Sequence, residues 1–490
     1  MAKSRSATNV ESKDPELKEY DQVIVELFNR LHKKDETRLP FAKKDIERVV
    51  VDLGNGATAN QLNDAAIHDW YRFVLAFPDH LVATYLDRFG IEVGATVLDP
   101  FVGTGTTLVE CKKRGIHAVG IDANPVTAFA SRVKTQWDID LDSFCRRRDS
   151  LLRHIRPALL EMTPVGRSTQ LTFDDAAFLR EAGPSYGTLA RTTSNEIIAL
   201  IPKGAISPLP LSKTLVVRNA ILDQPADDIR DLFLLALAAA VVGEVSNLGF
   251  GPEVYVSKQR EDADVYQAFA ARLDHAEADL RAVQPLKPFA NSQVFCEDAR
   301  LLSAFVADKI DAVITSPPYP NEKDYTRITR LEMVLLGFIK DKKDLRQLKN
   351  RLLRSNTRNV FVNDDDGQNV ADVPAIRQIA KQVEGRRIEK GADSGFERLY
   401  HRVVLEYFGG MYRVLRELER VMRRGAQAAI VVGDQMSYFQ VPIKTAELLA
   451  QLVETKDLRY RVVGIDEFRT RRATATRKDI SETVLILKRK

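Results

Sequence analysis

The stretch ATVLDPFVGTGTTLVECKKRGIHAVGIDANP, residues 95–125, constrains the fold more than any other part of the chain. Its pattern is a short apolar strand ending at Asp99, a glycine loop at 103–105, a helix over 106–113 and a second strand ending at Asp122. Elements in this order form the first half of a doubly wound sheet that binds a nucleotide-like ligand. The sequence therefore predicts an α/β fold with a mostly parallel sheet.

The glycine loop indicates the kind of ligand. In a dinucleotide-binding loop a third glycine lets the helix N-terminus pack close to a pyrophosphate, but Leu108 fills that position here. Asp99 is expected to place negative charge at the mouth of the loop, which suits a ligand with a cationic amine better than one with phosphates. S-adenosylmethionine carries such an amine, and Asp122 could bind its ribose hydroxyls. The alternative, an ordinary turn with convenient glycines, is disfavoured by the flanking strands.

A second motif, DAVITSPPYPNEKDY at 311–325, ends another apolar strand. The strand must stop there because proline cannot donate a hydrogen bond to a sheet. The residues that follow it, which we call the elbow, are Ser316, Pro317, Pro318 and Tyr319. Ser316 and the Pro317 carbonyl could accept hydrogen bonds from an exocyclic amine, and Tyr319 could stack on a base rotated out of a duplex. The alternative is an exposed polyproline ligand, which the apolar strand before it disfavours.

Both motifs resemble those of a known family. LDPFVGTGTT at 98–107 and TSPPY at 315–319 are similar to the cofactor and catalytic motifs of the S-adenosylmethionine-dependent amino-methyltransferases of DNA. The resemblance extends from about Phe77 to the C-terminus, with a long unmatched segment between the motifs. It implies a doubly wound, seven-stranded Rossmann-like sheet and methyl transfer to an exocyclic nitrogen. Its SPPY form is more typical of cytosine-N4 enzymes than of adenine-N6 enzymes.

The resemblance also implies the residues of the site. The elbow would hold the target base. Asp298, in QVFCEDARLL, would contact the adenine amine of the cofactor, and Phe77, in WYRFVLAFPDHLV, would line its methionine end. Each of these two could instead be a turn or core residue. The implied cofactor-binding residues are Phe77, Asp99, Phe101, Gly103, Gly105, Thr106, Asp122 and Asp298.

The spacing of the motifs predicts an inserted segment. Two βα units need about 60–80 residues, and far more chain separates the glycine loop from the elbow. The insertion is predicted at 132–290, with an extended-looking piece, KTLVVRNAIL at 213–222, and a buried helix at 232–242. Many relatives have the two motifs in the reverse order. The rest of the predicted division is a helical extension at 1–66 and a methyltransferase domain at 67–131 and 291–490.

The two ends of the chain carry further predicted elements. Asp14-Pro15 predicts the start of one N-terminal helix, and KKDIERVVVDLG at 43–54 predicts another. A helix over 396–422 leads to the strand AAIVVGD, and YRVVGID and ETVLILKR predict two final strands. A closing hairpin of this kind matches the way methyltransferase sheets of the resembled family end.

Two segments could read the target sequence: the insertion, and the basic segment 340–358. This segment has eight basic residues against two acidic ones, and such a run can neutralise DNA phosphates. Lys349, Arg351 and Arg354 are the predicted phosphate contacts. The alternative is a solvated helix face, which most charge runs are.

Composition excludes other kinds of protein. The net charge of +4 permits a polyanionic partner. The three cysteines form no CxxC pair, so neither disulfides nor a metal site are predicted, and a reducing cytoplasm is expected. None of them follows a proline, which disfavours covalent catalysis at cytosine C5. No signal peptide or membrane span is predicted, because the longest apolar run, at 232–242, is too short.

These observations predict a site-specific DNA methyltransferase that acts on cytosine N4 in double-stranded DNA. The expected setting is a restriction-modification or defence system, with a cognate restriction enzyme as a possible partner. One alternative is transfer to adenine N6 or to a base in RNA. Another is a silent recognition subunit, which the intact glycine loop and elbow disfavour.

Overall fold

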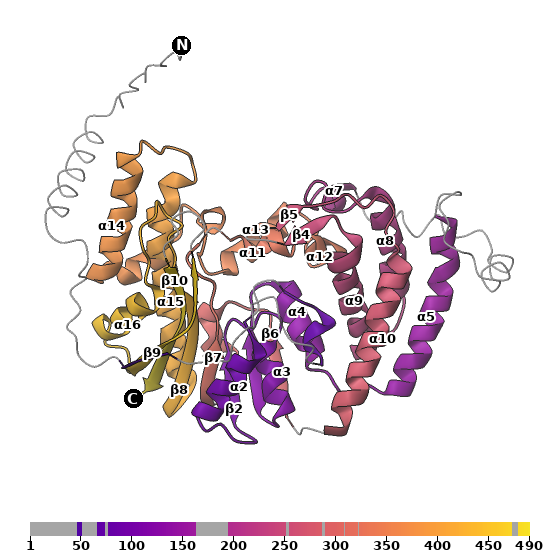
Figure 1. The fold of residues 1–490 in the computed structure, drawn as a ribbon, viewed down its shortest axis with the longest axis horizontal. Helices are drawn as coiled ribbons and strands as arrows, with labels where there is room; N and C mark the ends of the chain where they lie inside the picture. Colours follow the sequence, from indigo (N-terminus) through magenta and orange to yellow (C-terminus); the bar gives the residue numbers. More distant parts are fainter. Residues whose placement is uncertain are drawn as a thin grey trace, which may run out of the picture.

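The computed structural model of the chain describes residues 47–50, 66–73, 77–162, 195–250, 254–286, 290–307, 309–321, 323–472 and 479–490. A single large sheet lies at the centre, with strand order β1-β9-β10-β8-β7-β2-β3-β6 (Figure 1). Its strands are β1 (Glu47–Val50), β2 (Thr96–Asp99), β3 (His117–Ile121), β6 (Ser292–Phe295), β7 (Ile310–Thr315), β8 (Met422–Gly433), β9 (Tyr460–Arg472) and β10 (Asp479–Arg489).

The pairing of the strands confirms the predicted fold class. Every strand pair of the large sheet is parallel except the two made by β10, which runs antiparallel to β8 and to β9. The predicted closing hairpin is therefore β9 and β10. Strands β2, β3 and β6 to β10 are the seven strands of the predicted Rossmann-like sheet, and β1 adds one more at the edge beside β9.

Helices cover both faces of the sheet, so its strands are apolar on both sides. One face packs against α2 (Asp79–Arg88) and α3 (Thr106–Lys113), and the other against α14 (Pro374–Glu389), α15 (Tyr400–Val421) and α16 (Thr445–Thr455). Neighbouring residues point to opposite faces: Val97 packs with the first group and Leu98 with the second. Two of these helices were predicted closely from the sequence, at 106–113 and 396–422.

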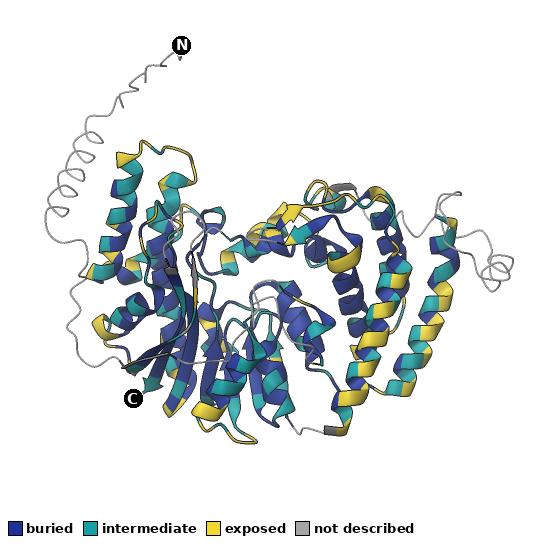
Figure 2. Ribbon diagram, viewed as in Figure 1, coloured by how far each residue is buried: buried dark blue, intermediate teal, exposed yellow. Residues whose placement is uncertain are grey.

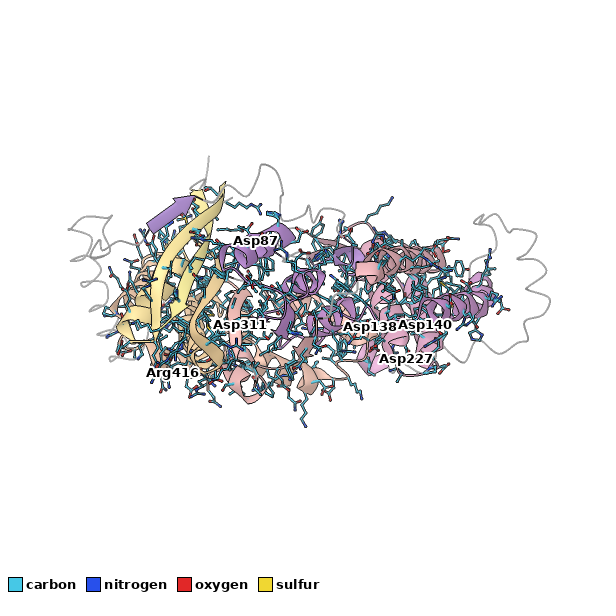
Figure 3. The ribbon with its side chains drawn as sticks, turned by 90° about the horizontal axis from the view of Figure 1, so that it is seen from below. Asp87, Asp138, Asp140, Asp227, Asp311 and Arg416 are labelled. Carbon is cyan, nitrogen blue, oxygen red and sulfur yellow. The ribbon has the colours of Figure 1, made fainter. Side chains whose placement is uncertain are left out.

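Most of the predicted insertion forms a helical lobe beside the sheet (Figures 1 and 3). Its elements are α5 (Leu141–Glu161), α7 (Asn195–Ile198), α8 (Pro208–Leu222), α9 (Asp228–Ala240), α10 (Val265–Val283) and a hairpin of β4 (Leu248–Phe250) and β5 (Val254–Val256). Figure 3 labels Asp138, Asp140 and Asp227 in this lobe, away from Asp87 and Asp311 in the sheet part. The predicted buried helix is α9, whose residues from Leu232 to Ala240 are all buried (Figure 2).

The core of the lobe continues into the sheet part. The same cluster of buried side chains includes Phe129 of α4 (Pro125–Lys134), Ile328 of α11 (Tyr325–Ile328) and Leu331 of α12 (Arg330–Leu335). The lobe is therefore packed against the elements that follow the glycine loop and the elbow. The predicted division of the chain at 66, 131 and 290 stays a prediction.

Two predicted elements are wrong. The extended-looking residues 213–222 lie in helix α8, because tertiary packing buries Val216, Val217 and Ile221 on a helix in spite of their strand propensity. Part of the helix predicted at 43–54 is a strand instead: Glu47–Val50 pair with β9 as β1. The helix predicted after Asp14 lies outside the described residues.

The remaining helices are short or lie near the elbow. They are α13 (Lys342–Arg351), η1 (His68–Trp70), η3 (Val241–Val245), η4 (Gln284–Leu286), η5 (Ala299–Ala304), η6 (Thr357–Asn359), η7 (Asp366–Val370) and η8 (Glu397–Leu399). Among the helices of the described ranges, none combines the length and apolar character needed to cross a membrane.

Candidate functional site

The two sequence motifs meet in the middle of the sheet, at the carboxyl ends of its parallel strands. Strands β2 and β7 are parallel neighbours, with Val97 opposite Ala312 and Leu98 opposite Val313. The glycine loop and the elbow therefore leave the carboxyl ends of adjacent strands. This is also where the order of the sheet reverses, since β3 continues on one side of β2 and β7 and β8 on the other. Ligands of doubly wound sheets bind at such a point.

Asp99 joins the two motifs. Its Oδ1 accepts hydrogen bonds from Thr315 Oγ1 (2.6 Å) and from the Phe101 backbone N–H (3.1 Å), and its Oδ2 accepts one from Thr107 Oγ1 (2.7 Å). The residue is 0% exposed. The expectation that Asp99 presents charge at the mouth of the loop is therefore wrong, because three protein donors surround the carboxylate below the surface. Burial raises the pKa of Asp99 to about 6.

The two glycines of the loop serve different purposes. Both have positive φ, +51° at Gly103 and +90° at Gly105, which side chains disfavour. A Cβ atom on Gly105 would lie 3.0 Å from the backbone Cα of Ser131, so α4 packs directly on this glycine. A Cβ atom on Gly103 would meet nothing within 4 Å. The loop is therefore closely packed at Gly105 and open at Gly103, and Thr106 begins α3 as a buried residue.

Asp122 faces the open side of the loop. Its Oδ2 accepts a hydrogen bond from the Gly103 N–H (3.0 Å), and its Oδ1 accepts one from the Asn124 N–H (2.8 Å). The side chain keeps partial exposure, and burial of the rest raises its pKa to about 6. Each carboxylate oxygen has a further lone pair. This geometry fits a carboxylate that binds ribose hydroxyls beside an open glycine.

The elbow combines buried and accessible residues. Thr315 and Pro317 are buried, whereas Ser316, Pro318 and Tyr319 are partly exposed. The Tyr319 ring packs on the end of β8, since a Cβ atom on Gly433 would lie 2.9 Å from its Cε2 atom. Tyr319 and Phe101 pack against the same core cluster from the elbow and the glycine loop.

Two tyrosines that lie close to the elbow were not evident from the sequence. Tyr407 of α15 is 0% exposed, and its hydroxyl has no hydrogen-bond partner among the described residues. Burial raises the pKa of Tyr407 far above its usual value, and Tyr319 and Tyr325 raise it further. Burial, followed by Tyr319 and Asp122, likewise raises the pKa of Tyr325. The sequence predicts a helix over 396–422, and nothing in it singles out Tyr407.

Two further residues are implied by the resemblance, Asp298 and Phe77. Asp298 is buried, and its carboxylate accepts hydrogen bonds from Arg300 Nε (3.0 Å) and Nη2 (2.7 Å). Arg300 also pairs with Asp366 at 2.5 Å, so Asp298 belongs to a buried chain of charges. Phe77 is partly buried before α2. Their cofactor contacts stay predictions.

The basic segment divides into structural and exposed residues. Arg354 is 4% exposed, and its guanidinium binds Asp364 (2.8 Å) and three backbone carbonyls. A phosphate contact by Arg354 is therefore contradicted. Lys349 pairs with Asp324 at 3.2 Å, and Arg351 donates to the Cys296 carbonyl at 3.0 Å; their phosphate contacts stay predictions. The exposed cations of the segment are Lys340, Lys342, Lys343 and Arg346.

One group of possible metal ligands occurs among the described residues. Ligand atoms of His68, Asp79 and Glu110 lie within 4.8 Å of one another. Glu110 Oε1 already pairs with His68 Nε2 (2.9 Å) and with Lys113 Nζ (2.8 Å). A protein cation therefore already balances the carboxylate.

Comparison with known proteins gives a consistent result. A family model described as DNA methylase, for N6 and N4 enzymes, matches residues 11–129. The type II methyltransferase M.BsoBI of Geobacillus stearothermophilus is 26% identical over 299 residues, covering 60% of this chain and 57% of that protein. M.AvaI of Nostoc sp., also a type II methyltransferase, is 23% identical over 473 residues, covering 92% and 90%.

Among solved structures, TrmN from Thermus thermophilus aligns with 84% of this chain and with 49% of the TrmN chain, at 9% sequence identity. The TM-score is 0.26, which is too low to support any argument. The family model covers the glycine loop and ends before the elbow, whereas the match to M.AvaI covers 92% of the chain. In residues 11–129 the chain is similar to DNA amino-methyltransferases, and over most of its length it is similar to type II methyltransferases.

Proposed function

We propose that this protein transfers a methyl group from S-adenosylmethionine to N4 of a cytosine rotated out of double-stranded DNA. The observation that carries the proposal is the Asp99–Thr315 hydrogen bond, which fixes a cofactor-type glycine loop beside an SPPY elbow. The type II relatives support DNA as the substrate.

The residues around the open glycine fit the cofactor. S-adenosylmethionine supplies the methyl group from its sulfonium centre. Asp122 accepts hydrogen bonds from the ribose hydroxyls, and Gly103 leaves space for the ligand because it has no side chain. Phe101 and Phe77 are partly buried apolar residues, packed against the cores on opposite faces of the sheet, and they would contribute apolar surface to the cofactor site.

The elbow acts on the amine. The lone pair of an exocyclic amine is delocalised into the base, so the amine must become tetrahedral as it attacks, and its proton then passes to solvent water. The Ser316 hydroxyl and the Pro317 carbonyl accept hydrogen bonds from the two N–H groups of the amine. These bonds favour the tetrahedral amine, on which positive charge develops in the transition state. Tyr319 stacks on the base, and its ring is held against Gly433.

The exposed cations of α13 hold the DNA backbone. Lys342, Lys343 and Arg346 are exposed, and α13 is joined to the elbow segment by the Lys349–Asp324 ion pair. Phosphates bound here would lie next to the site of base rotation. We further propose that the protein works in the cytoplasm, in a restriction-modification system.

Cytosine N4 is preferred to adenine N6 because of the serine in SPPY. The test is incubation with labelled S-adenosylmethionine and, separately, DNA and RNA, followed by mass spectrometry of the nucleosides. N4-methylcytosine in DNA is the expected product. If the product is N6-methyladenine, or if only RNA is labelled, the acceptor is not cytosine N4 of DNA. If neither DNA nor RNA is labelled, the protein is a silent subunit.

A further inference from the structure

We infer that the β4–β5 hairpin of the helical lobe contacts base pairs of the DNA and helps to select the methylated site. This inference rests on the proposed function. It begins from exposed apolar surface: Phe250, Tyr255 and Val256 are 37%, 54% and 50% exposed, although they belong to two strands of three residues each. Tyr255 lies on one face of the hairpin, and Phe250 and Val256 lie on the other, so both faces carry exposed apolar surface. So much apolar surface on so small an element marks a contact site.

The ring of Tyr255 is held in a fixed position. Its cross-strand partner is Gly249, and a Cβ atom on Gly249 would lie 2.6 Å from the Cζ atom of that ring. The ring therefore lies across the bare backbone of β4, with its other face toward solvent. A flat aromatic ring that is already ordered loses little conformational entropy when it packs on another group.

The hairpin is anchored firmly at its base. Asn247 is 2% exposed, and its Nδ2 donates to the Gly204 carbonyl (3.0 Å) and to Ser207 Oγ (3.1 Å). Its Oδ1 accepts a hydrogen bond from the Arg260 N–H (2.6 Å). These contacts hold both strands at the end from which they leave the lobe.

The hairpin also has a fixed relation to the elbow. Its inward residues, Leu248 and Val254, belong to the same core cluster as Ile328 and Leu331 of α11 and α12, the helices that follow the elbow. In the view of Figure 1 the hairpin and α13 lie along the same upper rim of the molecule. A rigid element in this position can touch a duplex whose flipped base enters the elbow.

The charges beside the hairpin favour DNA as the partner. Lys203 and Lys258 are both exposed; Lys203 precedes Gly204, whose Cβ position is 3.7 Å from Val256. An apolar surface between two cations fits a groove, where apolar side chains meet thymine methyls or base edges and lysines meet phosphates. Two-stranded ribbons of this width enter the major groove. A purely apolar partner would gain nothing from the lysines, whereas the phosphates of DNA can pair with both.

The test compares the parent protein with Tyr255→Ala and Tyr255→Phe on a random-sequence DNA library, whose methylated sites are identified by sequencing. Val93→Ala, at a residue that is 78% exposed outside the lobe, is the matched control. We expect Tyr255→Ala to weaken duplex binding about tenfold, the scale of one stacking or apolar interaction. It should also relax the methylated motif at one or more positions. Cofactor binding should be unchanged, and Tyr255→Phe should act like the parent.

Each result has one meaning. If the parent methylates the library but Tyr255→Ala gives the same motif at the same affinity, the hairpin does not read DNA. If Tyr255→Ala instead changes self-association in sedimentation, with DNA affinity intact, the hairpin binds another copy of the chain and the inference is also wrong. A parent protein that methylates no DNA overturns the proposed function itself, which is a different outcome.

Discussion

The Thr315 hydroxyl donates a 2.6 Å hydrogen bond to the Asp99 carboxylate, and this bond links the strand that ends in the elbow to the strand that ends in the glycine loop. Thr107, in the first turn of α3, donates to the other carboxylate oxygen at 2.7 Å. Because the group is fully buried, water cannot replace either donor. One carboxylate therefore sets the distance between the proposed cofactor loop and the proposed base clamp.

Replacing Thr315 by valine tests this link. Valine has nearly the shape of threonine but no hydroxyl, so Asp99 would lose one donor in a buried position. We expect the free energy of unfolding to fall by about 1–3 kcal/mol and single-turnover methylation to slow. Thr315→Ser keeps the hydroxyl and should retain most of both. Equal stability of the valine and serine variants in urea unfolding would show that the bond contributes nothing.

The raised pKa of Asp99 predicts a specific pH dependence of stability. Its folded pKa of about 6 lies above the unfolded value of about 3.9. Between these values the folded carboxyl keeps a proton that the unfolded chain has lost. This contribution to stability is therefore complete below about pH 4 and is lost as the pH rises to about 6, by about 3 kcal/mol. Asp99→Asn removes the titrating carboxyl, so the stability of this variant relative to the parent should improve as the pH rises from about 4 to about 6. A difference between the two proteins that stays constant with pH would contradict the assignment.

Asp122 is expected to matter for cofactor affinity. Asp122→Asn replaces one carboxylate oxygen by an NH₂ group, which cannot accept a hydrogen bond. That position can then no longer accept from a ribose hydroxyl or from the backbone N–H, of Gly103 or of Asn124, that it faces. We expect S-adenosylmethionine binding to weaken by about 1–3 kcal/mol in calorimetric titration. Asp87→Asn, at an exposed residue of α2, is the control and should bind like the parent. An unchanged affinity in Asp122→Asn would remove this residue from the cofactor site.

The exposed cations of α13 should control the salt dependence of DNA binding. Lys342→Ala with Lys343→Ala should lower the slope of log affinity against log salt by about 0.9 for each phosphate that the variant no longer binds. The control is Lys381→Ala with Lys390→Ala, at exposed lysines of α14 and its end. If both pairs leave the slope unchanged, α13 is a solvated face.

Arg354 should behave differently from these lysines. Its removal leaves the Asp364 carboxylate without its cation in a largely buried position, with the Phe361 N–H still donating to it. We therefore expect Arg354→Ala to reduce the free energy of unfolding by about 3–5 kcal/mol, and urea unfolding measures this directly. A variant with normal stability but weaker DNA binding would restore Arg354 as a phosphate contact.

The sequence predicted the sheet and both motifs because these follow from local patterns. Apolar strands, glycines and prolines at fixed spacing determine where β2 and β7 end, and the rules of doubly wound sheets make them neighbours. The direction of a single side chain is a different matter. Asp99 was predicted at the mouth of the loop, but Thr107 and Thr315 turn it inward, and Thr315 is distant in sequence.

The other errors have the same origin. Charge density in 340–358 is a property of the sequence, but only the tertiary structure reveals that Arg354 caps backbone carbonyls while Lys342 is exposed. Likewise, the β-branched residues of α8 favour a strand locally, and burial in the lobe overrides that preference. The position of Tyr407 near the elbow depends on α15 crossing the sheet, which no local pattern contains.

The last prediction separates the two roles proposed for the elbow. Ser316→Ala removes an acceptor that acts on the amine in the transition state, so turnover should fall by about 10²–10³-fold while cofactor affinity stays nearly intact. Gly433→Ala acts on Tyr319 instead, because a Cβ atom there would lie 2.9 Å from the Tyr319 ring and must displace it. We expect this variant to weaken capture of the flipped base, with an effect similar to Tyr319→Ala, about 1–3 kcal/mol of stacking free energy. Single-turnover methylation of duplex DNA at saturating cofactor distinguishes them: excess DNA should rescue Gly433→Ala but not Ser316→Ala. If Ser316→Ala methylates as fast as the parent, the serine does not act on the amine.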